Sequence, residues 1–271
     1  MKTNIFFTTS SDGLKREGIG AVAQYQIICY VLSKIYDAEF YFTGFKNLHH
    51  YQYFNTTQEK WDQEITEFFN FKISPFLTHD VIHVNNDFSF LTSFDKKNIN
   101  TNILNLEGAY LMQIMNKILD EPKTREVLLE LKSNLKLCEN KKYFKNNKKN
   151  IAMHIRKFTQ TDCCTSSHRE YFTEQRKNIY LEHIKKLDHK DHVFHIFSQG
   201  KEEQFEFLKK ENVFLHIEEN PLVSLYHMIN ADFLITANSS LSYIAHLLGN
   251  HEKCFGRTNF CHKWKKETIL I

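Results

Sequence analysis

The sequence predicts an α/β protein of two domains, and three observations point to it. The chain has 271 residues, enough for two packed cores, and is 42% hydrophobic and 25% charged, as globular domains are. Its second half alternates strand-length apolar runs with helix-length amphipathic segments, an order typical of a doubly wound parallel sheet. Residues 141–150 form a polar, lysine- and asparagine-rich run with nothing to bury. We therefore expect domains at 1–145 and 150–271.

In the first half, a β-prone run at residues 4–8 leads into a loop that carries Gly18 and Gly20. A helix is expected directly after it, because apolar residues recur there at three- and four-residue steps. These residues form one predicted stripe: Ala21, Tyr25, Ile28, Leu32 and Ile35. The pattern then predicts strands at 39–42 and 81–84, and helices at 61–69, 110–119 and 124–137.

In the second half, four strand-and-helix units follow one another, which predicts the parallel sheet. The expected strands are residues 151–155, 192–197, 213–216 and 233–236. The expected helices are residues 171–187, 201–210, 221–229 and 240–248. Pro221 after Asn220 suits a helix start, with asparagine as the cap and proline at the first helical position.

Composition and charge exclude several functional classes. The net charge is only +3, from 35 basic and 32 acidic side chains, which is far from the basic excess of a nucleic-acid-binding protein. Six cysteines without regular spacing favour reduced thiols over a disulfide framework. No apolar run approaches the roughly 20 residues that span a bilayer, and the N-terminal run is too short for a signal peptide. We therefore expect a soluble, cytoplasmic protein without a membrane span.

Metal and cofactor signatures are absent from the sequence. There is no phosphate-binding GxxxxGK[ST] motif, no complete dinucleotide fingerprint after Gly18 and Gly20, and no DxD motif. The histidines at 189, 192 and 195 have no CxxC nearby. Cys163 and Cys164 with His168 also lack the spacing of zinc ligands. We therefore expect neither a bound metal nor a resident cofactor.

Polar residues gather where the predicted strands end, and in open α/β sheets ligands bind beyond these carboxyl ends. The set comprises Arg16, Glu17, Gly18 and Gly20 after the first strand, His154 and Arg156 after the strand at 151, Ser198, Gln199 and Gly200 after the strand at 192, and Asn238, Ser239 and Ser240 after the strand at 233. The chain has only eight glycines, so Gly18, Gly20, Gly200 and Gly249 are expected where a side chain would not be tolerated. Together these residues form a ring of polar groups around the expected site, and such a ring suits a phosphate-bearing ligand.

Each part of the ring has two interpretations at this point. The guanidinium of Arg156 either meets a diphosphate through two parallel charged hydrogen bonds or lies on a solvated strand end. His154, two residues earlier, is either a ligand contact or a buried structural histidine. Residues 238–240 either offer free backbone donors to an anion or simply cap the helix that follows. Residues 198–200 either contact a base or ribose or make a turn.

Three blocks resemble those of the fucosyltransferase-like glycosyltransferases, a group that includes related viral and algal-type enzymes. Residues 153–157, with His154 and Arg156, resemble the HxRR region of that family. Residues 195–200 resemble the strand and loop that follow, and residues 227–243 are similar to its ADxLIxSxSSFSxxA block. The match departs from HxRRGD at Lys157 and Thr159, where the family has its second arginine and its aspartate.

The resemblance implies a GT-B fold, with two Rossmann-like domains facing a cleft and the nucleotide sugar bound by the C-terminal domain. It implies that Arg156 stabilises the leaving diphosphate. Glu17, beside Gly18, is the nearest match to the catalytic glutamate of the protein O-fucosyltransferase relatives and would act as general base. The donor-binding residues it implies are Gly18, Gly20, His154, Arg156, Ser198, Gln199, Gly200, Asn238, Ser239, Ser240 and Tyr243.

The function expected from the resemblance is that of a metal-independent, inverting glycosyltransferase. Its donor would be GDP-fucose first and UDP-xylose second, and its acceptor a glycan hydroxyl. Two alternatives stay open: a catalytically inactive nucleotide- or glycan-binding module of the same fold, and a sugar-nucleotide epimerase. An aromatic cluster between Phe45 and Trp61 either stacks against acceptor sugars or belongs to the core.

Overall fold

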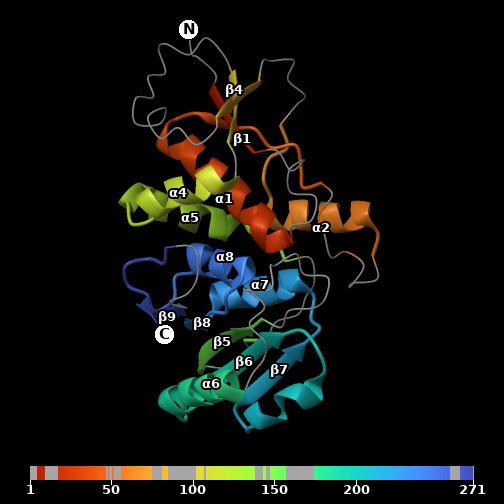
Figure 1. The fold of residues 1–271 in the computed structure, drawn as a ribbon, viewed down its shortest axis with the longest axis vertical. Helices are drawn as coiled ribbons and strands as arrows, with labels where there is room; N and C mark the ends of the chain where they lie inside the picture. The colour runs from red at the N-terminus through yellow and green to blue at the C-terminus, as the bar shows by residue number, and fades with distance from the viewer. Residues whose placement is uncertain are drawn as a thin grey trace. The chain divides into compact units, whose positions relative to one another are not determined.

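The computed structural model describes residues 5–9, 18–46, 48, 51, 56–74, 81–84, 102–106, 108–137, 143–144, 147–156, 174–256 and 263–270. The chain divides into two compact units, Met1–Cys138 and Glu139–Ile271. Each unit is an α/β fold built on its own sheet (Figure 1). All strand pairs that the structure describes are parallel, as expected for strands joined by helical crossovers.

The sheet of the first unit has four strands in the order β2-β1-β4-β3. The strands are β1 (Ile5–Thr8), β2 (Glu39–Phe40), β3 (Val81–Val84) and β4 (Asn102–Leu106). The sequence pattern did not predict β4, whose five residues include two asparagines. Strand β4 forms although its local sequence has little strand propensity, because it pairs with β1 on one side and with β3 on the other, so both of its edges are hydrogen-bonded.

The helices of the first unit are α1 (Ile19–Ile35), α2 (Gln58–Phe69), α4 (Gly108–Ile118) and α5 (Pro122–Asn134). Helix α1 is buried on more sides than its predicted stripe, because it packs against β1, α4 and α5. Ala21 and Tyr25 of the stripe are only partly buried, whereas Val22 and Val31 outside it are almost fully buried. The single-stripe expectation was therefore wrong for this interior helix.

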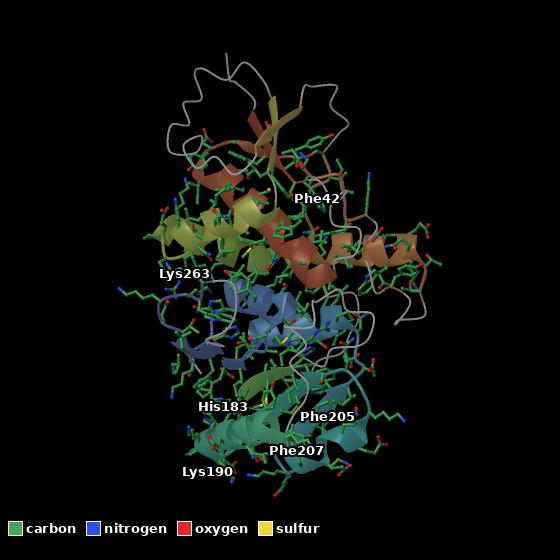
Figure 2. The ribbon with its side chains drawn as sticks, in the orientation of Figure 1. Phe42, His183, Lys190, Phe205, Phe207 and Lys263 are labelled. Atoms are coloured by element: carbon green, nitrogen blue, oxygen red, sulfur yellow. The ribbon has the colours of Figure 1, made fainter. Side chains whose placement is uncertain are left out.

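Aromatic rings fill much of the core of the first unit. Phe69 and Phe71 stack with their ring centroids 5.7 Å apart, and Phe42, labelled in Figure 2, meets Phe71 edge-on at 5.2 Å. Phe45 and Trp61 are 3% and 1% exposed. The core interpretation therefore applies to both residues that bound the aromatic cluster; His49, His50 and Tyr53 within it lie outside the described residues.

The sheet of the second unit has six strands in the order β10-β9-β8-β5-β6-β7. Four of them confirm the predicted strands to within two residues: β5 (Lys149–Ile155), β6 (His192–Ser198), β7 (Val213–Ile217) and β8 (Phe233–Ile235). Two further strands, β9 (Lys253–Gly256) and β10 (Ile269–Leu270), extend one edge and were not predicted. They are too short to carry a periodic signal and depend on pairing with β8 and with each other.

The helical segments of the second unit are α6 (Glu174–Leu187), the 3-10 helix η5 (Glu202–Leu208), α7 (Pro221–Asn230) and α8 (Ser240–Leu248). Helix α8 has the predicted bounds, and Asn220 caps α7 by accepting a hydrogen bond from the Leu222 amide at 2.8 Å. An α-helix at 201–210 was wrong. Only Phe205 and Leu208 are buried there, and a spacing of three residues suits the 3-10 geometry.

The two faces of this sheet differ in character. One face carries the hydrophobic core, in which residues such as Met153 and Ile196 pack against α6 and against Phe205 of η5 (Figure 2). The register sets His154 of β5 beside Phe197 of β6 and Phe197 beside His216 of β7. Because neighbouring residues in register point to the same face, these three side chains lie together on the face opposite the core.

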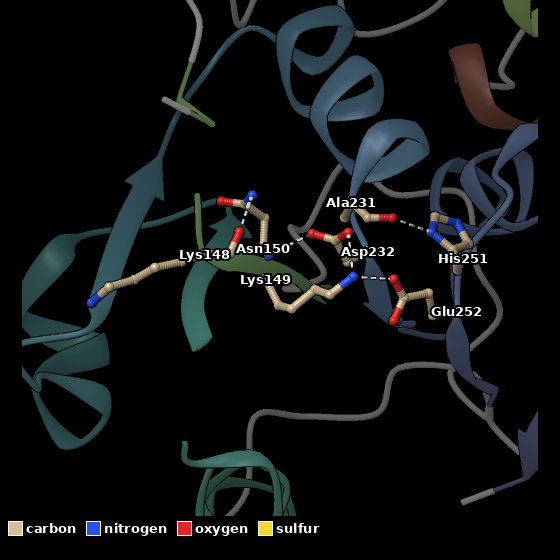
Figure 3. A network of polar contacts seen from close by, with 7 residues as sticks. All are labelled: Lys148, Lys149, Asn150, Ala231, Asp232, His251 and Glu252. Atoms are coloured by element: carbon tan, nitrogen blue, oxygen red, sulfur yellow. Dashed lines mark hydrogen bonds and ion pairs between the residues drawn. The ribbon is translucent and has the colours of Figure 1, made fainter. Parts of the chain in front are cut away.

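The amino ends of β5, β8 and β9 are tied together by a polar network (Figure 3). The carboxylate of Asp232, just before β8, accepts a hydrogen bond from the Asn150 amide at 2.7 Å. Lys149 lies 3.5 Å from the same carboxylate and also pairs with Glu252 before β9. Asp232, which belongs to the block that resembles ADxLI, therefore anchors the sheet edge opposite the carboxyl ends.

Two of the six cysteines, Cys29 and Cys254, lie in the described parts of the chain, and both are free and buried. Burial raises the pKa of the Cys254 thiol to about 12 and that of Cys29 further, so both remain protonated. Cys138, Cys163, Cys164 and Cys261 lie outside the described residues. Among the described residues, no helix has both the length and the apolar character needed to cross a membrane.

Candidate functional site

The carboxyl edge of the second sheet contains a topological switch point. Strand β5 lies between β6 and β8, and the chain continues from β5 to β6 and β7 on one side and later to β8, β9 and β10 on the other. In open α/β sheets, ligands bind beyond the carboxyl ends of the two strands at such a point, here β5 and β8. The polar residues that follow β5, β6 and β8 belong to this edge.

Arg156 and Gln199 contact each other across this edge. Nη1 of Arg156 donates a hydrogen bond to Oε1 of Gln199 at 2.7 Å. The two residues come directly after β5 and β6, whose last residues, Ile155 and Ser198, are paired in register. The Ser198 hydroxyl donates to the Ile155 carbonyl at 2.7 Å and so fixes the two strand ends together. The guanidinium is therefore held at the strand ends by a side chain from the neighbouring loop.

Gly200 and Glu218 form a second contact at the same edge. Gly200 has φ of +116°, a conformation that favours glycine, and its amide donates to the carboxylate of Glu218 just after β7. The Glu218 amide in turn donates to the Ser198 carbonyl at 3.1 Å. Glu218 was not among the predicted site residues, although it follows the strand expected at 213–216, just as the other polar residues follow their strands.

Helix α8 begins at the same edge, beyond the end of β8. Its cap is Ser239, whose hydroxyl accepts a hydrogen bond from the Leu241 amide at 3.3 Å, and its first turn contains no acidic residue. The hydroxyl of Ser242 is fully buried and bonds to the Ala237 carbonyl at 3.1 Å. The capping interpretation thus holds for Ser239. A helix start still leaves amide groups without intrahelical partners, and these favour an anion.

His154 is buried beneath the strand ends, with 7% of its surface exposed. Within the described residues its Nδ1 atom has no hydrogen-bond partner. Burial, and secondarily the charge of Arg156, lower the pKa of His154 to about 3, so the imidazole is neutral at physiological pH. His154 therefore adds no positive charge to the edge.

Tyr243 is oriented toward the packing of its own unit. It is fully buried, its hydroxyl donates to the Lys263 carbonyl at 3.1 Å, and its ring meets Trp264 edge-on at 5.6 Å. These contacts account for both the ring and the hydroxyl in structural terms. Tyr243 consequently has no part in the function proposed below.

Of the site residues expected from the first unit, the structure describes Gly18 and Gly20. Arg16 and Glu17 lie outside the described residues, as do Lys157 and Thr159. Gly18 caps α1 with its carbonyl, which accepts from the Ala21 amide at 3.0 Å, and Gly20 is buried in the first turn of α1. The role of Glu17 as a base stays a prediction.

No three histidine, cysteine, aspartate or glutamate side chains come together in the described parts of the chain in a way that could hold a metal ion. Arg156 brings a positive charge to the carboxyl edge in the described parts of the chain. What this arrangement can do chemically is bind an anion through one guanidinium and a helix start.

No protein-family model matches the chain, and no curated protein matches it in sequence. Among solved structures, the chain is similar to a mutant of Arabidopsis thaliana FUT1 in complex with GDP, with 14% identity and a TM-score of 0.47 over 93% of this chain and 69% of that one. It is also similar to POFUT1 in complex with GDP-fucose, with 11% identity and a TM-score of 0.42 over 100% of this chain and 98% of that one.

Proposed function

We propose that the protein is a glycosyltransferase that moves a sugar from a nucleoside diphosphate to a glycan hydroxyl. One observation carries the proposal: Gln199 holds Arg156 at the switch point of a parallel sheet. The strand beside β5 there is β8, which leads into the start of α8. A guanidinium and a helix start at one sheet edge suit two neighbouring phosphate groups.

The proposed chemistry follows from where negative charge develops. When the bond between the sugar and the diphosphate breaks, the diphosphate oxygens gain charge while the sugar becomes cationic. Arg156 donates two parallel hydrogen bonds to those oxygens, and the first-turn amides of α8 face the other phosphate. Gln199 keeps the guanidinium in its orientation before the donor arrives, so little reorganisation is needed when the charge appears. In this proposal, no metal is needed.

The donor and the acceptor chemistry rest on the sequence resemblance. GDP-fucose is the first candidate and UDP-xylose the second. Glu17 takes the proton from the acceptor hydroxyl, which then attacks the sugar from the side opposite the diphosphate and inverts its configuration. Ser198 fixes the two strand ends, and in this proposal Gln199, Gly200 and the start of α8 contact the donor.

The proposal is tested by turnover of nucleotide sugars. The full chain is incubated with GDP-fucose or UDP-xylose and a set of glycan acceptors, with and without EDTA, and the product anomer is read by NMR. Transfer with inversion supports the proposal. Glu17→Gln is expected to lower kcat far more than donor affinity, and a wild-type rate in this variant would assign the base elsewhere.

A second candidate is an inactive module of the same fold that binds a nucleotide. The departure from HxRRGD at Lys157 and Thr159 favours it, because two charged positions of the family's motif are altered. Binding of GDP or UDP without release from any nucleotide sugar would support the module and contradict the transferase.

A further inference from the structure

The second unit carries four histidines on or over one face of its sheet. The proposed anion site at the carboxyl edge gives no role to this group. We define this four-histidine face as His154 of β5, His195 of β6, His216 of β7 and His227 of α7. Burial is the main cause that lowers the pKa of each of them. A histidine free in solution takes up a proton near pH 6.5, so mild acid favours any state in which one of these rings leaves its buried position.

The aromatic pair Tyr143 and Phe144, which precedes β5, is packed against this face, so the expectation that residues 141–150 have nothing to bury was wrong. The ring of Tyr143 stacks on His216 with centroids 4.0 Å apart and lies 4.4 Å from His227. Phe144 meets His195 at 4.8 Å and His227 at 5.1 Å. Three of the four histidines therefore contact this two-residue segment, which belongs to the second unit.

A directional hydrogen bond joins this segment to His227. Nδ1 of His227 lies 2.8 Å from the carbonyl of Val223, one turn earlier in α7, so Nδ1 carries the ring proton. Nε2 is then a lone-pair acceptor, and the backbone amide of Tyr143 donates to it at 3.1 Å. A proton added to Nε2 would replace the acceptor by a donor that faces another donor. The contact holds only while His227 is neutral.

Some of the other ionisable groups around His227 oppose its protonation, and others favour it. His195 and His216 form a neutral pair, with Nδ1 of the first 3.0 Å from Nε2 of the second, and a charge on His227 disfavours one on either. Tyr226 meets His227 edge-on. The carboxylate of Glu219 favours protonation of His216 and His227 and also accepts a hydrogen bond from the Tyr143 hydroxyl. Burial is nevertheless the largest influence on both histidines.

We propose that His227, with the four-histidine face around it, forms an acid-sensitive latch that holds Tyr143 and Phe144 on the second unit at neutral pH and releases them on mild acidification. His216 can carry charge under a stacked tyrosine ring, whereas His227 loses its acceptor atom when protonated. The latch stands independently of the proposed function.

The latch is tested by hydrogen exchange of the Tyr143 amide in the full chain, corrected for the intrinsic effect of pH. A histidine that must be neutral when bound and has a pKa of about 6.5 when free weakens binding about tenfold between pH 7.5 and 5.5. Protection of the Tyr143 amide is expected to fall by that factor, while amides of β5 and β8, which open only when the whole unit unfolds, stay more protected than Tyr143 at both pH values. Unchanged protection of Tyr143 would overturn the latch. Protection of Tyr143 equal to that of β5 would also overturn it, because the segment would then open only with the whole unit.

Two variants assign the effect to one side chain. In His227→Gln, the side-chain carbonyl can accept from the Tyr143 amide but does not titrate, so protection is expected to stay the same at both pH values. His189→Gln removes an exposed histidine away from the face and is expected to keep the wild-type response. A wild-type response in His227→Gln would overturn the assignment, and the wild-type titration alone decides the proposal if that variant fails to fold.

Discussion

Arg156 donates a hydrogen bond to Gln199 at 2.7 Å, across the ends of the two neighbouring strands β5 and β6. This contact presents the guanidinium of Arg156 at the switch point of the sheet. His154 adds no positive charge there, because its imidazole is neutral. The two residues belong to separate blocks of the sequence, 43 positions apart, and the parallel register brings them together. The proposed anion chemistry depends on this pairing.

Gln199 is expected to act by orienting Arg156. Gln199→Leu has a similar volume but offers no acceptor, so kcat should fall by about tenfold, the lower range for a hydrogen bond to a charged group. Gln199→Glu keeps an acceptor but adds negative charge beside the diphosphate, so it should mainly raise the KM for the donor. Steady-state kinetics separate these effects. Wild-type constants for Gln199→Leu would remove Gln199 from this role.

Removal of metal ions is expected to leave the transfer rate unchanged. In the proposed mechanism, Arg156 and the start of α8 stabilise the leaving diphosphate, so the charge balance needs no divalent cation. The measurement is the initial rate after dialysis against EDTA, compared with the rate after adding Mg²⁺ or Mn²⁺. A strict requirement for either ion would contradict the metal-independent mechanism.

The stability of the second unit is expected to fall in mild acid. Burial lowers the pKa of His154 and His195 to about 3, whereas the unfolded chain restores the ordinary value of about 6.5. The unfolded state therefore binds more protons below about pH 6.5. The contribution of these two histidines to stability is fully present above that pH and is lost as the pH falls toward 3. At pH 5 the loss is about 2 kcal/mol for each of these two histidines.

The measurement is the free energy of unfolding in urea at pH 7.5 and at pH 5. His195→Gln should reduce the dependence on pH, and the exposed His189→Gln should leave it as in the wild type. Equal stability of the wild-type protein at both pH values would show that these histidines are not buried in their neutral form.

Gly249→Ala is expected to destabilise the second unit by about 1–3 kcal/mol, the usual cost of overpacking. A Cβ atom at Gly249 would lie 2.6 Å from the backbone carbonyl of Ala245 and would overlap the ring of His251. The carbonyl belongs to the last turn of α8 and cannot move away freely. Thermal unfolding checks the loss, with the exposed Glu203→Ala as the control. An unchanged melting temperature would contradict the close approach.

The C-terminal half was predictable because its central strands β5 and β6 are buried and mostly apolar. Residues 151–155 and 192–197 are nearly continuous apolar runs, and such runs between turn residues indicate buried parallel strands. The alternation of strands and helices then predicted the parallel sheet. The positions of Arg156 and Gln199 directly after two strands marked them as candidate site residues. That these two side chains bond to each other depends on the register of β5 with β6, which no local pattern encodes.

Other features could not be read from local sequence. Strands β4, β9 and β10 form through pairing with neighbours rather than through their own periodicity. The contact of His227 with Tyr143 joins residues 84 positions apart. Tyr243 fits the resemblance as a donor contact, and only the fold places its hydroxyl on the Lys263 carbonyl.

Calorimetric titration with GDP and with UDP tests most directly whether Arg156 holds a diphosphate. Wild type, Arg156→Ala and Lys190→Ala are compared; Lys190 is an exposed residue before β6, at the opposite edge of the same sheet (Figure 2), so both variants lose one positive charge. Wild type should bind one nucleotide, Arg156→Ala should bind it at least about tenfold more weakly, and Lys190→Ala should match wild type. Equal affinity of Arg156→Ala and wild type, or no binding by wild type, would contradict the account.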